Sequence, residues 1–182
     1  MNDQAVFYPV KLITGVLFPD EELWQWTKSA LAARWGAHED ESEPLLFSSV
    51  TDYYADIAPV LYRGFLSFGG LRDASLLREW KMVACEIEAL SGVPRRVNID
   101  PGYLDGARLV LASTKDHAHR VYLGGGMHAE VTLRYRQGRW TPFDYTFPDF
   151  SDGRYHGFLS RVRKRWLEEM AERRRFDSRP SR

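Results

Sequence analysis

The sequence predicts an α+β fold with a ferredoxin-like split βαβ core, extended by an antiparallel β-meander and followed by a C-terminal helix. The first half alternates strand-like and helix-like segments twice, and the second half contains short apolar segments separated by glycine-rich turns. A chain of 182 residues with 44% hydrophobic residues is long enough to bury one sizeable core. We therefore expect a single α+β domain over residues 1–173 and a basic flexible tail at residues 174–182.

The first strand-helix unit occupies residues 10–35. Residues 10–18 (VKLITGVLF) form an apolar run that Pro19 ends, and Asp20 is placed to cap the helix that follows. Glycine at position 36 predicts the end of that helix. We expect the charged segment 38–43 to be a solvated loop, residues 44–47 a short strand and residues 48–59 a long loop.

The second unit has the same order. Residues 61–68 predict a strand, and a helix that starts at Asp73 or Ser75 and ends before Gly92 carries apolar residues at helical spacing. A strand at residues 96–99 then completes the order of a ferredoxin-like split βαβ arrangement. Proline and glycine at positions 101 and 102 predict a turn, which would place Asp100 at the end of that strand.

The meander follows as strands at residues 107–113, 120–123, 127–135 and 140–143. Gly124, Gly125 and Gly126 lead from one strand into another, without the helix and lysine that a phosphate-binding loop requires. They predict a hairpin turn and do not support a nucleotide site of the P-loop kind. An aromatic and acidic loop follows, and the last helix is expected at residues 157–173.

The cysteine count and the absence of a recognisable secretory signal indicate the cellular compartment. Cys85 is the single cysteine and cannot form an internal disulfide, and no secretory signal is recognisable, so we expect a cytoplasmic protein. No apolar run is long enough to span a membrane.

Charge is divided unevenly along the chain although the formal net charge is zero. Residues 1–92 carry 7 basic and 14 acidic side chains, and residues 93–182 carry 18 and 11, which leaves net charges of −7 and +7. The asymmetry is compatible with contacts between the two halves, with a self-complementary homodimer, or with a basic surface for phosphates.

The densest mixture of core-forming and reactive residues lies between Arg95 and Tyr135. Candidate catalytic residues are those with imidazole, carboxylate or ammonium groups in this stretch: His117, His119, Asp100, Lys115 and Glu130. Candidate ligand-binding residues are Asn98, Tyr103, Arg120, Asp52, Tyr53, Tyr54 and Arg63. In an extended reading, Glu130, Thr132 and Arg134 would share one polar strand face.

Two kinds of chemistry are open for these residues. His117 and His119 could ligate a divalent metal together with a carboxylate, for which the candidates are Asp100, Glu130, Asp144 and Asp149. Alternatively, the lysine and arginines could neutralise a phosphate while a histidine acts as general acid or base. The competing interpretations are histidines that hydrogen-bond at a strand turn and solvated loop cations.

Several ordered motifs carry a resemblance to a known family. These are PVKLITGVLFPDEEL, ESEPLLFSSVTDYY, RRVNIDPGYL, LVLASTKDHAHRVYLGGGMHAEVTLRY and FDYTFPDF. Together they resemble the prokaryotic family known as domain of unknown function 4416, from about Pro9 to the C-terminal helix. The resemblance implies no established activity; the label GTP-binding that some members carry has no matching P-loop here.

Three functions follow as hypotheses. The first is an enzyme or binding protein for a small anionic ligand, which predicts that the candidate residues converge in one pocket. The second is a non-catalytic, self-associating interaction module, which predicts scattered polar residues and an exposed apolar patch. RNA or nucleotide binding is third, because the basic C-terminal segment is not accompanied by an RNA-binding aromatic signature on the strands.

Overall fold

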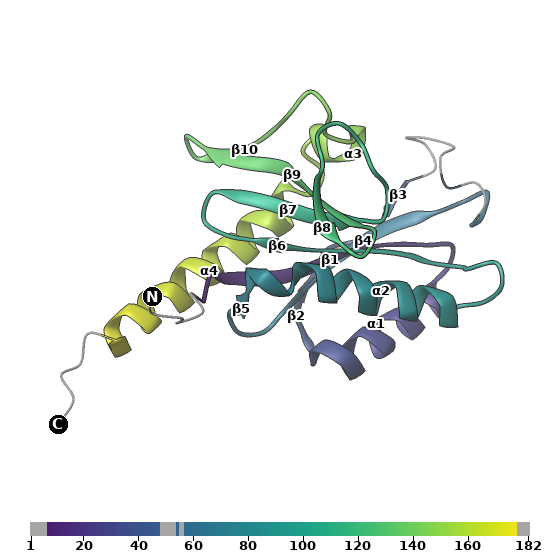
Figure 1. Cartoon of the computed structure of the whole chain (residues 1–182), viewed down its shortest axis with the longest axis horizontal. Coiled ribbons are helices and arrows are strands. Elements are labelled where there is room, and N and C mark those ends of the chain that lie inside the picture. Colours follow the sequence, from purple (N-terminus) through teal and green to yellow (C-terminus); the bar gives the residue numbers. More distant parts are fainter. Residues whose placement is uncertain (1–6, 48–53, 55–56, 178–182) are drawn as a thin grey trace.

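The computed structural model describes residues 7–47, 54 and 57–177 and has an α+β architecture (Figure 1). Its strands are β1 (Pro9–Phe18), β2 (His38–Glu41), β3 (Leu45–Leu46), β4 (Tyr62–Phe68), β5 (Arg72–Asp73), β6 (Asn98–Leu104), β7 (Arg108–Ser113), β8 (Val121–Gly124), β9 (Met127–Arg136) and β10 (Arg139–Pro142). Its helices are α1 (Glu21–Trp35), the short 3-10 helix η1 (Ala74–Leu76), α2 (Leu77–Leu90), α3 (Pro148–Ser151) and α4 (His156–Asp177).

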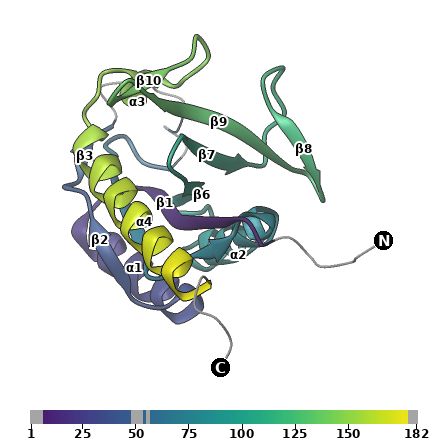
Figure 2. The ribbon, with the colours of Figure 1, turned by 90° about the vertical axis from the view of Figure 1, so that its left-hand side faces the viewer.

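The ten strands of the described residues form one sheet in which every pair is antiparallel. Its main order is β10-β9-β7-β6-β1-β4-β2, with β3 on β4, β5 on β1 and β8 on β9. Figure 2 shows the long strand β9 running beside β7, with β10 near one end and β8 beside the other. Because β1 lies between β4 and β6, segments far apart in the sequence become neighbours at the centre of the sheet.

Helices α1 and α2 pack side by side against one face of the sheet (Figure 1). Their apolar stripes, which include Trp24, Leu31, Trp80 and Ile87, form one core cluster with alternate residues of the central strands. Asp20 caps α1 as expected, because its carboxylate accepts a hydrogen bond from Leu23 N at 2.9 Å.

Helices α3 and α4 cover part of the opposite face. Phe65 lies at the centre of this second core cluster and contacts Phe150, Tyr155 and Phe158 through their rings. The fully buried Lys11 of β1 ties α4 to the sheet, since its ammonium lies 2.6 Å from Glu169 Oε1 and 2.7 Å from Glu39 Oε1. The rest of this face is open to the loops that build the site described below.

The prediction of a turn at residues 100–102 is wrong. Strand β6 runs from Asn98 to Leu104 without a break. A Cβ atom at position 102 would lie only 2.2 Å from Val110 O on the neighbouring strand β7. The absence of a side chain at Gly102 therefore allows β6 and β7 to approach closely. Asp100 lies within a strand rather than at its end.

The prediction of a solvated loop at residues 38–43 is also wrong, because residues 38–41 form β2 and pair with β4. Charged side chains are tolerated there because the strand lies at the sheet edge and has basic partners. Asp40 of β2 accepts hydrogen bonds from the guanidinium of Arg161 on α4 at 3.0 and 3.1 Å.

Most of the other expected elements are confirmed to within a few residues. Strands β1, β4, β7 and β9, both long helices of the first half and the C-terminal helix all occur where the sequence pattern predicts them. Helix α4 continues to Asp177, so the predicted helix end at residue 173 is too early. Residues 178–182 of the predicted tail lie outside the described residues.

Charges from the acidic and basic halves of the chain meet inside the fold. Examples are Arg161 with Asp40, Arg96 with Asp20 and Arg95 with Glu88. The asymmetry is thus partly matched by internal ion pairs. Among the described residues, no helix has the length and apolar character needed to cross a membrane.

Candidate functional site

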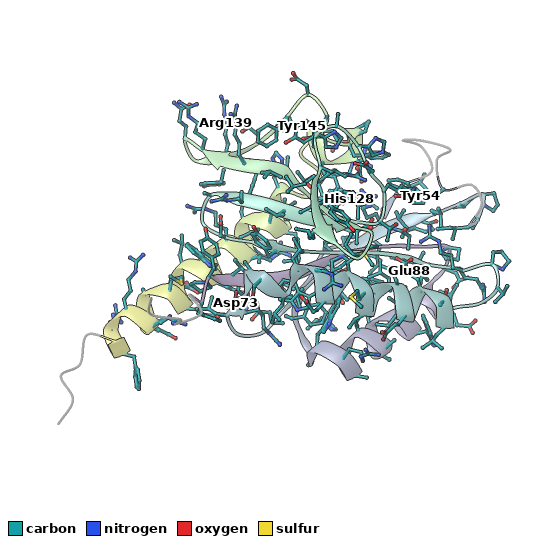
Figure 3. The ribbon with its side chains drawn as sticks, viewed as in Figure 1. Tyr54, Asp73, Glu88, His128, Arg139 and Tyr145 are labelled. Carbon is teal, nitrogen blue, oxygen red and sulfur yellow. The ribbon has the colours of Figure 1, made fainter. Side chains whose placement is uncertain are left out.

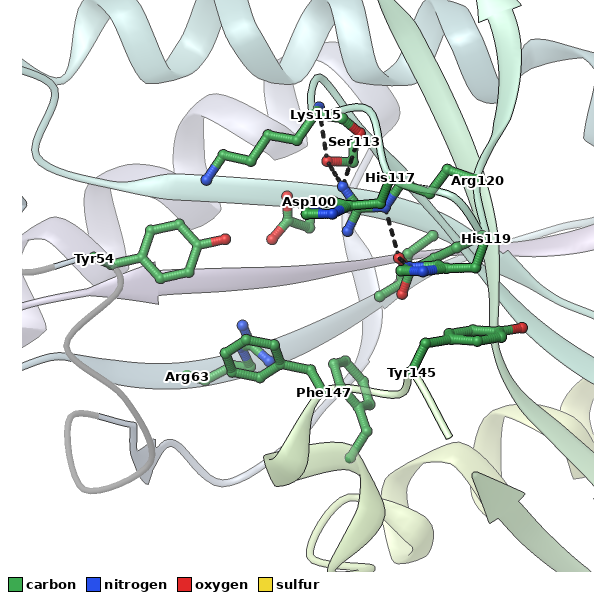
Figure 4. Close-up of a pocket in the computed structure, with 13 residues that line it drawn as sticks. Tyr54, Arg63, Asp100, Ser113, Lys115, His117, His119, Arg120, Tyr145 and Phe147 are labelled. Carbon is green, nitrogen blue, oxygen red and sulfur yellow. Dashed lines mark hydrogen bonds and ion pairs between the residues drawn. The ribbon is translucent and has the colours of Figure 1, made fainter. Parts of the chain in front are cut away.

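A cavity of about 270 Å³ lies on the sheet face that carries α3 and α4 (Figure 4). Its floor comes from four strands, which contribute Arg63 of β4, Asp100 of β6, Leu111 and Ser113 of β7, and Glu130 of β9. The loop at residues 114–120 forms one wall with Lys115, His117, His119 and Arg120. The other walls are aromatic and consist of Tyr54, Tyr145, Phe147 and Phe150.

Arg120 braces the wall formed by residues 114–120. Its Nε donates to Glu130 Oε2 at 2.7 Å, and its Nη1 donates to Ser113 Oγ at 2.8 Å and to Lys115 O at 2.9 Å. The Lys115 backbone N–H also donates to Ser113 Oγ, at 3.1 Å. These bonds hold the loop against β7 and β9, so Arg120 shapes the cavity as well as lining it.

His119 is held in a defined orientation. Its Nε2 lies 3.2 Å from Glu130 Oε2, and its ring stacks on Tyr145 with centroids 4.2 Å apart and planes inclined by 4°. His117 stacks on the other side of His119, at 5.7 Å and 9°. Burial and the nearby Glu130 carboxylate raise the pKa of Tyr145, which keeps this stacking phenol neutral. An imidazole oriented by a carboxylate is suited to general acid–base chemistry.

Arg63 is a buried cation in an aromatic environment. Its guanidinium lies over the rings of Phe47, Phe147 and Phe150, with the carbon Cζ 4.4, 5.8 and 5.3 Å from the respective centroids. Its Nη1 lies 2.5 Å from Asp149 Oδ2. Figure 4 shows the nitrogen end of Arg63 directed into the cavity.

Asp149 anchors Arg63 from below the cavity. The carboxylate is fully buried, and Tyr155 Oη donates to its Oδ2 at 3.1 Å. Burial raises the pKa of Asp149, although Arg63 and Tyr155 act in the opposite direction. The Asp149–Arg63 pair is therefore a desolvated ion pair whose cationic member faces the cavity.

Asp100 is held by two residues that lie behind it. Asn98 Nδ2 donates to Asp100 Oδ2 at 2.7 Å, and Lys81 Nζ donates to Asp100 Oδ1 at 3.3 Å and to Ile99 O at 2.6 Å. Lys81 Nζ also lies 3.4 Å from Glu88 Oε1. Burial lowers the pKa of Lys81, but the attraction of Asp100 and Glu88 raises it more, so the pKa lies above its usual value.

All five candidate catalytic residues line this one cavity, together with Arg63, Arg120 and Tyr54. Asn98 does not line it and instead supports Asp100. Tyr103 lies on the opposite sheet face in a separate hollow beside Leu123, because residues three apart in a strand point to opposite sides. Asp52 and Tyr53 lie outside the described residues.

Sequence reasoning missed Lys81, Ser113, Tyr145 and Phe147. Lys81 had a recognisable signal, because it and Glu88 interrupt the apolar stripe of α2 at positions that the helix buries. Ser113, at the end of β7, and Tyr145 and Phe147, in the β10–α3 loop, had no such signal. Only the folded arrangement brings them to the cavity.

The described part of the chain contains no cluster of three or more His, Cys, Asp or Glu residues suited to a metal ion. The carboxylates considered as metal ligands either contact other side chains or lie outside the cavity. Glu130 faces Arg120 and His119, Asp149 holds Arg63, and Asp144 is exposed and does not line the cavity.

The family pattern described as Domain of unknown function (DUF4416) matches residues 8–166. The chain belongs to the DUF4416 family. The resemblance seen in the sequence motifs is thereby confirmed, and the match includes every described residue that lines the cavity. No curated protein and no solved structure matches this DUF4416 chain. The family description names no activity, so the chemistry of the cavity is the basis for assigning one.

Proposed function

We propose that this DUF4416 protein binds a small anionic, phosphorylated ligand in the cavity between the sheet and the loop at residues 114–120. The observation that carries the proposal is the buried guanidinium of Arg63, which is directed into the cavity (Figure 4). Lys115, His117 and His119 stand on the facing wall. Guanidinium, ammonium and imidazole are the side-chain groups that most often bind phosphate oxygens.

The environment of Arg63 supports an anion as its partner. A guanidinium has five N–H donors, and Asp149 is its only ion-pair partner among the described residues. The surrounding aromatic rings exclude water, which strengthens attraction between the cation and a bound anion. The desolvation cost of Arg63 is already met in the folded protein, so an entering phosphate gains from a preorganised donor.

The ligand is proposed to undergo proton transfer at His119. Glu130 lies against Nε2 and orients the ring, while stacking on Tyr145 prevents the ring from tilting. Such a pair is able to donate a proton to, or remove one from, a group of the bound ligand. Arg63 and Lys115 would first bind the ligand. His119 would then act on the bound ligand as a general acid or base.

Isothermal titration of the full chain with inorganic phosphate, and with small organic phosphates, tests the proposal in the presence and absence of Mg²⁺. We expect saturable binding, and we expect Lys115→Ala to weaken it about ten-fold through loss of one charge-assisted contact. The matched control is Lys164→Ala, because Lys164 is 78% exposed on α4 and does not line the cavity. No binding to wild-type protein, or equal loss in both variants, would refute the proposal.

We infer that β1, α1, β2, β4, α2 and β6 form a ferredoxin-like split βαβ unit. The support is the order β6-β1-β4-β2 with antiparallel neighbours, and the packing of both helices on one face. The remaining strands would then extend this unit on the β6 side and carry the loop that closes the cavity.

Self-association is the second candidate function. It is favoured by β8, in which Val121 is 67% exposed and Tyr122 is 63% exposed. Two apolar side chains on a short strand could pair with the same strand of a second copy. Size-exclusion chromatography with light scattering tests this, with a Val121→Lys variant expected to remain monomeric if β8 forms the contact. A monomeric wild-type protein at all concentrations would exclude it.

The lone Cys85 fits a reducing compartment such as the cytoplasm. Nucleic-acid binding ranks third, because the basic residues of α4 are interspersed with Glu168, Glu169 and Glu172 rather than forming a continuous basic face.

A further inference from the structure

From the floor of the cavity we infer the class of ligand, namely a small phosphorylated molecule with a hydroxyl or ammonium group that donates a hydrogen bond to Asp100. This inference rests on the proposed function, because Arg63 and Lys115 are assigned to the phosphate. Asp100 would give the cavity a second recognition point, with a charge opposite to that of Arg63 and Lys115. The ligand would thus be an amino or hydroxy compound carrying a phosphate, rather than a bare anion.

The carboxylate of Asp100 is held in place from behind. One oxygen accepts from Asn98 at 2.7 Å and the other from Lys81 at 3.3 Å. An ionised carboxylate can accept about four hydrogen bonds, so these two contacts leave acceptor capacity on each oxygen. The Asp100 side chain is 25% exposed and lines the cavity, so that the remaining capacity is accessible to a ligand.

The support for Asp100 comes from a buried charge network on the helix side of the sheet. Lys81 contacts Glu88, and Glu88 in turn accepts from Ile99 N at 2.7 Å and from Arg95 at 2.6 Å. Burying an ammonium is costly unless its partners are fixed. A carboxylate that served only as a solvated surface charge would need no such buried support. The network makes Asp100 a preorganised acceptor.

The sheet is arranged so that Lys81 can reach Asp100. The ladder between β6 and β7 covers Gly102, Tyr103 and Leu104 and does not extend to Asp100. At this position β6 is paired with β1, where Asp100 lies opposite Gly15. The end of the β6–β7 ladder therefore coincides with the cavity floor, and α2 supports the strand from the other side.

The two charged regions restrict the ligand. Arg63 and Lys115 favour an anion, whereas Asp100 repels one and attracts a donor group. A volume of about 270 Å³ lies at the small end of ligand pockets, which are about 300–1,000 Å³. That size fits a phosphate joined to a short amino or hydroxy chain or to a single small ring.

Matched ligand pairs test the inference by calorimetric titration of the full chain. Glycerol 3-phosphate is compared with propyl phosphate, which lacks the hydroxyl groups, and phosphoethanolamine with ethyl phosphate, which lacks the ammonium group. We expect the wild-type protein to bind at least one donor-bearing ligand about ten-fold or more tightly than its partner. We expect Asp100→Asn to reduce that preference to about two-fold or less, while the donor-free phosphate binds no more weakly.

The control variant is Asp144→Asn, since Asp144 is exposed and does not line the cavity. It should retain the wild-type preference. Equal affinities within both pairs for wild-type protein would overturn the inference and leave the proposed phosphate binding intact. Absence of binding for all four compounds and for inorganic phosphate would overturn the proposed function as well. Because the wild-type comparison needs no substitution, the test does not depend on whether Asp100→Asn folds normally.

Discussion

Lys81 Nζ lies 3.3 Å from Asp100 Oδ1, although Lys81 belongs to a helix on one face of the sheet and Asp100 lines a cavity on the other. Glu88, the second acidic partner of Lys81, is on the helix side (Figure 3). The pair therefore links α2 to the cavity floor across strand β6. The stability of the core and the geometry of the site depend on the same buried ammonium.

Replacing Lys81 with methionine should destabilise the fold by about 2–3 kcal/mol, because Glu88 and Asp100 would lose the ammonium between them while Glu88 keeps Arg95 as a partner. Chemical denaturation measures the change. In a double-mutant cycle with Asp100→Asn, the combined loss should be smaller than the sum of the single losses, since the two side chains are in contact. Simple additivity would show that the 3.3 Å approach contributes nothing to stability.

His156 should make the fold less stable in mild acid. Burial lowers the pKa of His156 below its usual 6.5, so the folded state disfavours its protonation. Its contribution is present above about pH 6.5 and is lost as the pH falls through the lowered pKa, because the unfolded chain binds the proton more readily. The melting temperature of His156→Gln should fall less between about pH 7 and about pH 5 than that of wild-type protein.

The control for this measurement is Met82→Gln, since Met82 is 42% exposed on α2 and does not titrate. This variant should show the wild-type pH dependence. An identical acid-induced decrease for His156→Gln and wild-type protein would contradict the assignment to His156.

Alanine at position 102 should destabilise the protein by about 3 kcal/mol or more, because the new Cβ would meet the backbone of β7 at 2.2 Å. Gly157→Ala is the matched control, since a Cβ there meets nothing within 4 Å and the residue lies in α4. It should be neutral or stabilise by up to about 1 kcal/mol. Thermal unfolding of the two variants distinguishes them, and similar melting temperatures would disprove the close approach.

Lysine at position 120 should loosen the loop at residues 114–120. A lysine cannot make the separate Nε and Nη1 contacts by which Arg120 joins Glu130, Ser113 and Lys115 O. Amide hydrogen exchange should become faster in this loop, with a loss of global stability of about 1–2 kcal/mol. Arg139→Lys, at an exposed position on β10, serves as the control and should leave exchange in the loop unchanged. Unaltered protection in Arg120→Lys would mean that other contacts hold the loop.

Local sequence patterns predicted much of the cavity because part of it is built from near neighbours. Ser113 and His128 pair across β7 and β9, and Leu111 pairs with Glu130, so the loop between them returns close to its starting point. Lys115, His119 and Glu130 consequently meet within one antiparallel unit. Their meeting depends on a short connection, and closing a short connection costs less chain entropy than closing a long one.

The misplaced turn at residues 100–102 shows where local reasoning fails. Pro101 and Gly102 have strong turn propensities, but a glycine is also required where two backbones approach closely. Position 102 faces Val110 and Leu111 of β7, which no local pattern reveals. Likewise, the charges of His38–Glu41 indicate solvent, whereas pairing with β4 places them in a strand.

The sequence by itself determined the two amphipathic helices, most strands of the meander and the gathering of Lys115, His119 and Glu130, because periodicity and short connections act over a few residues. Only the tertiary structure decided that Arg63 and Asp100 line the same cavity as these three residues. It also decided that Lys81 supports Asp100. Those contacts depend on the order of strands in the sheet, which places β1 between β4 and β6 and is set by packing across the whole chain.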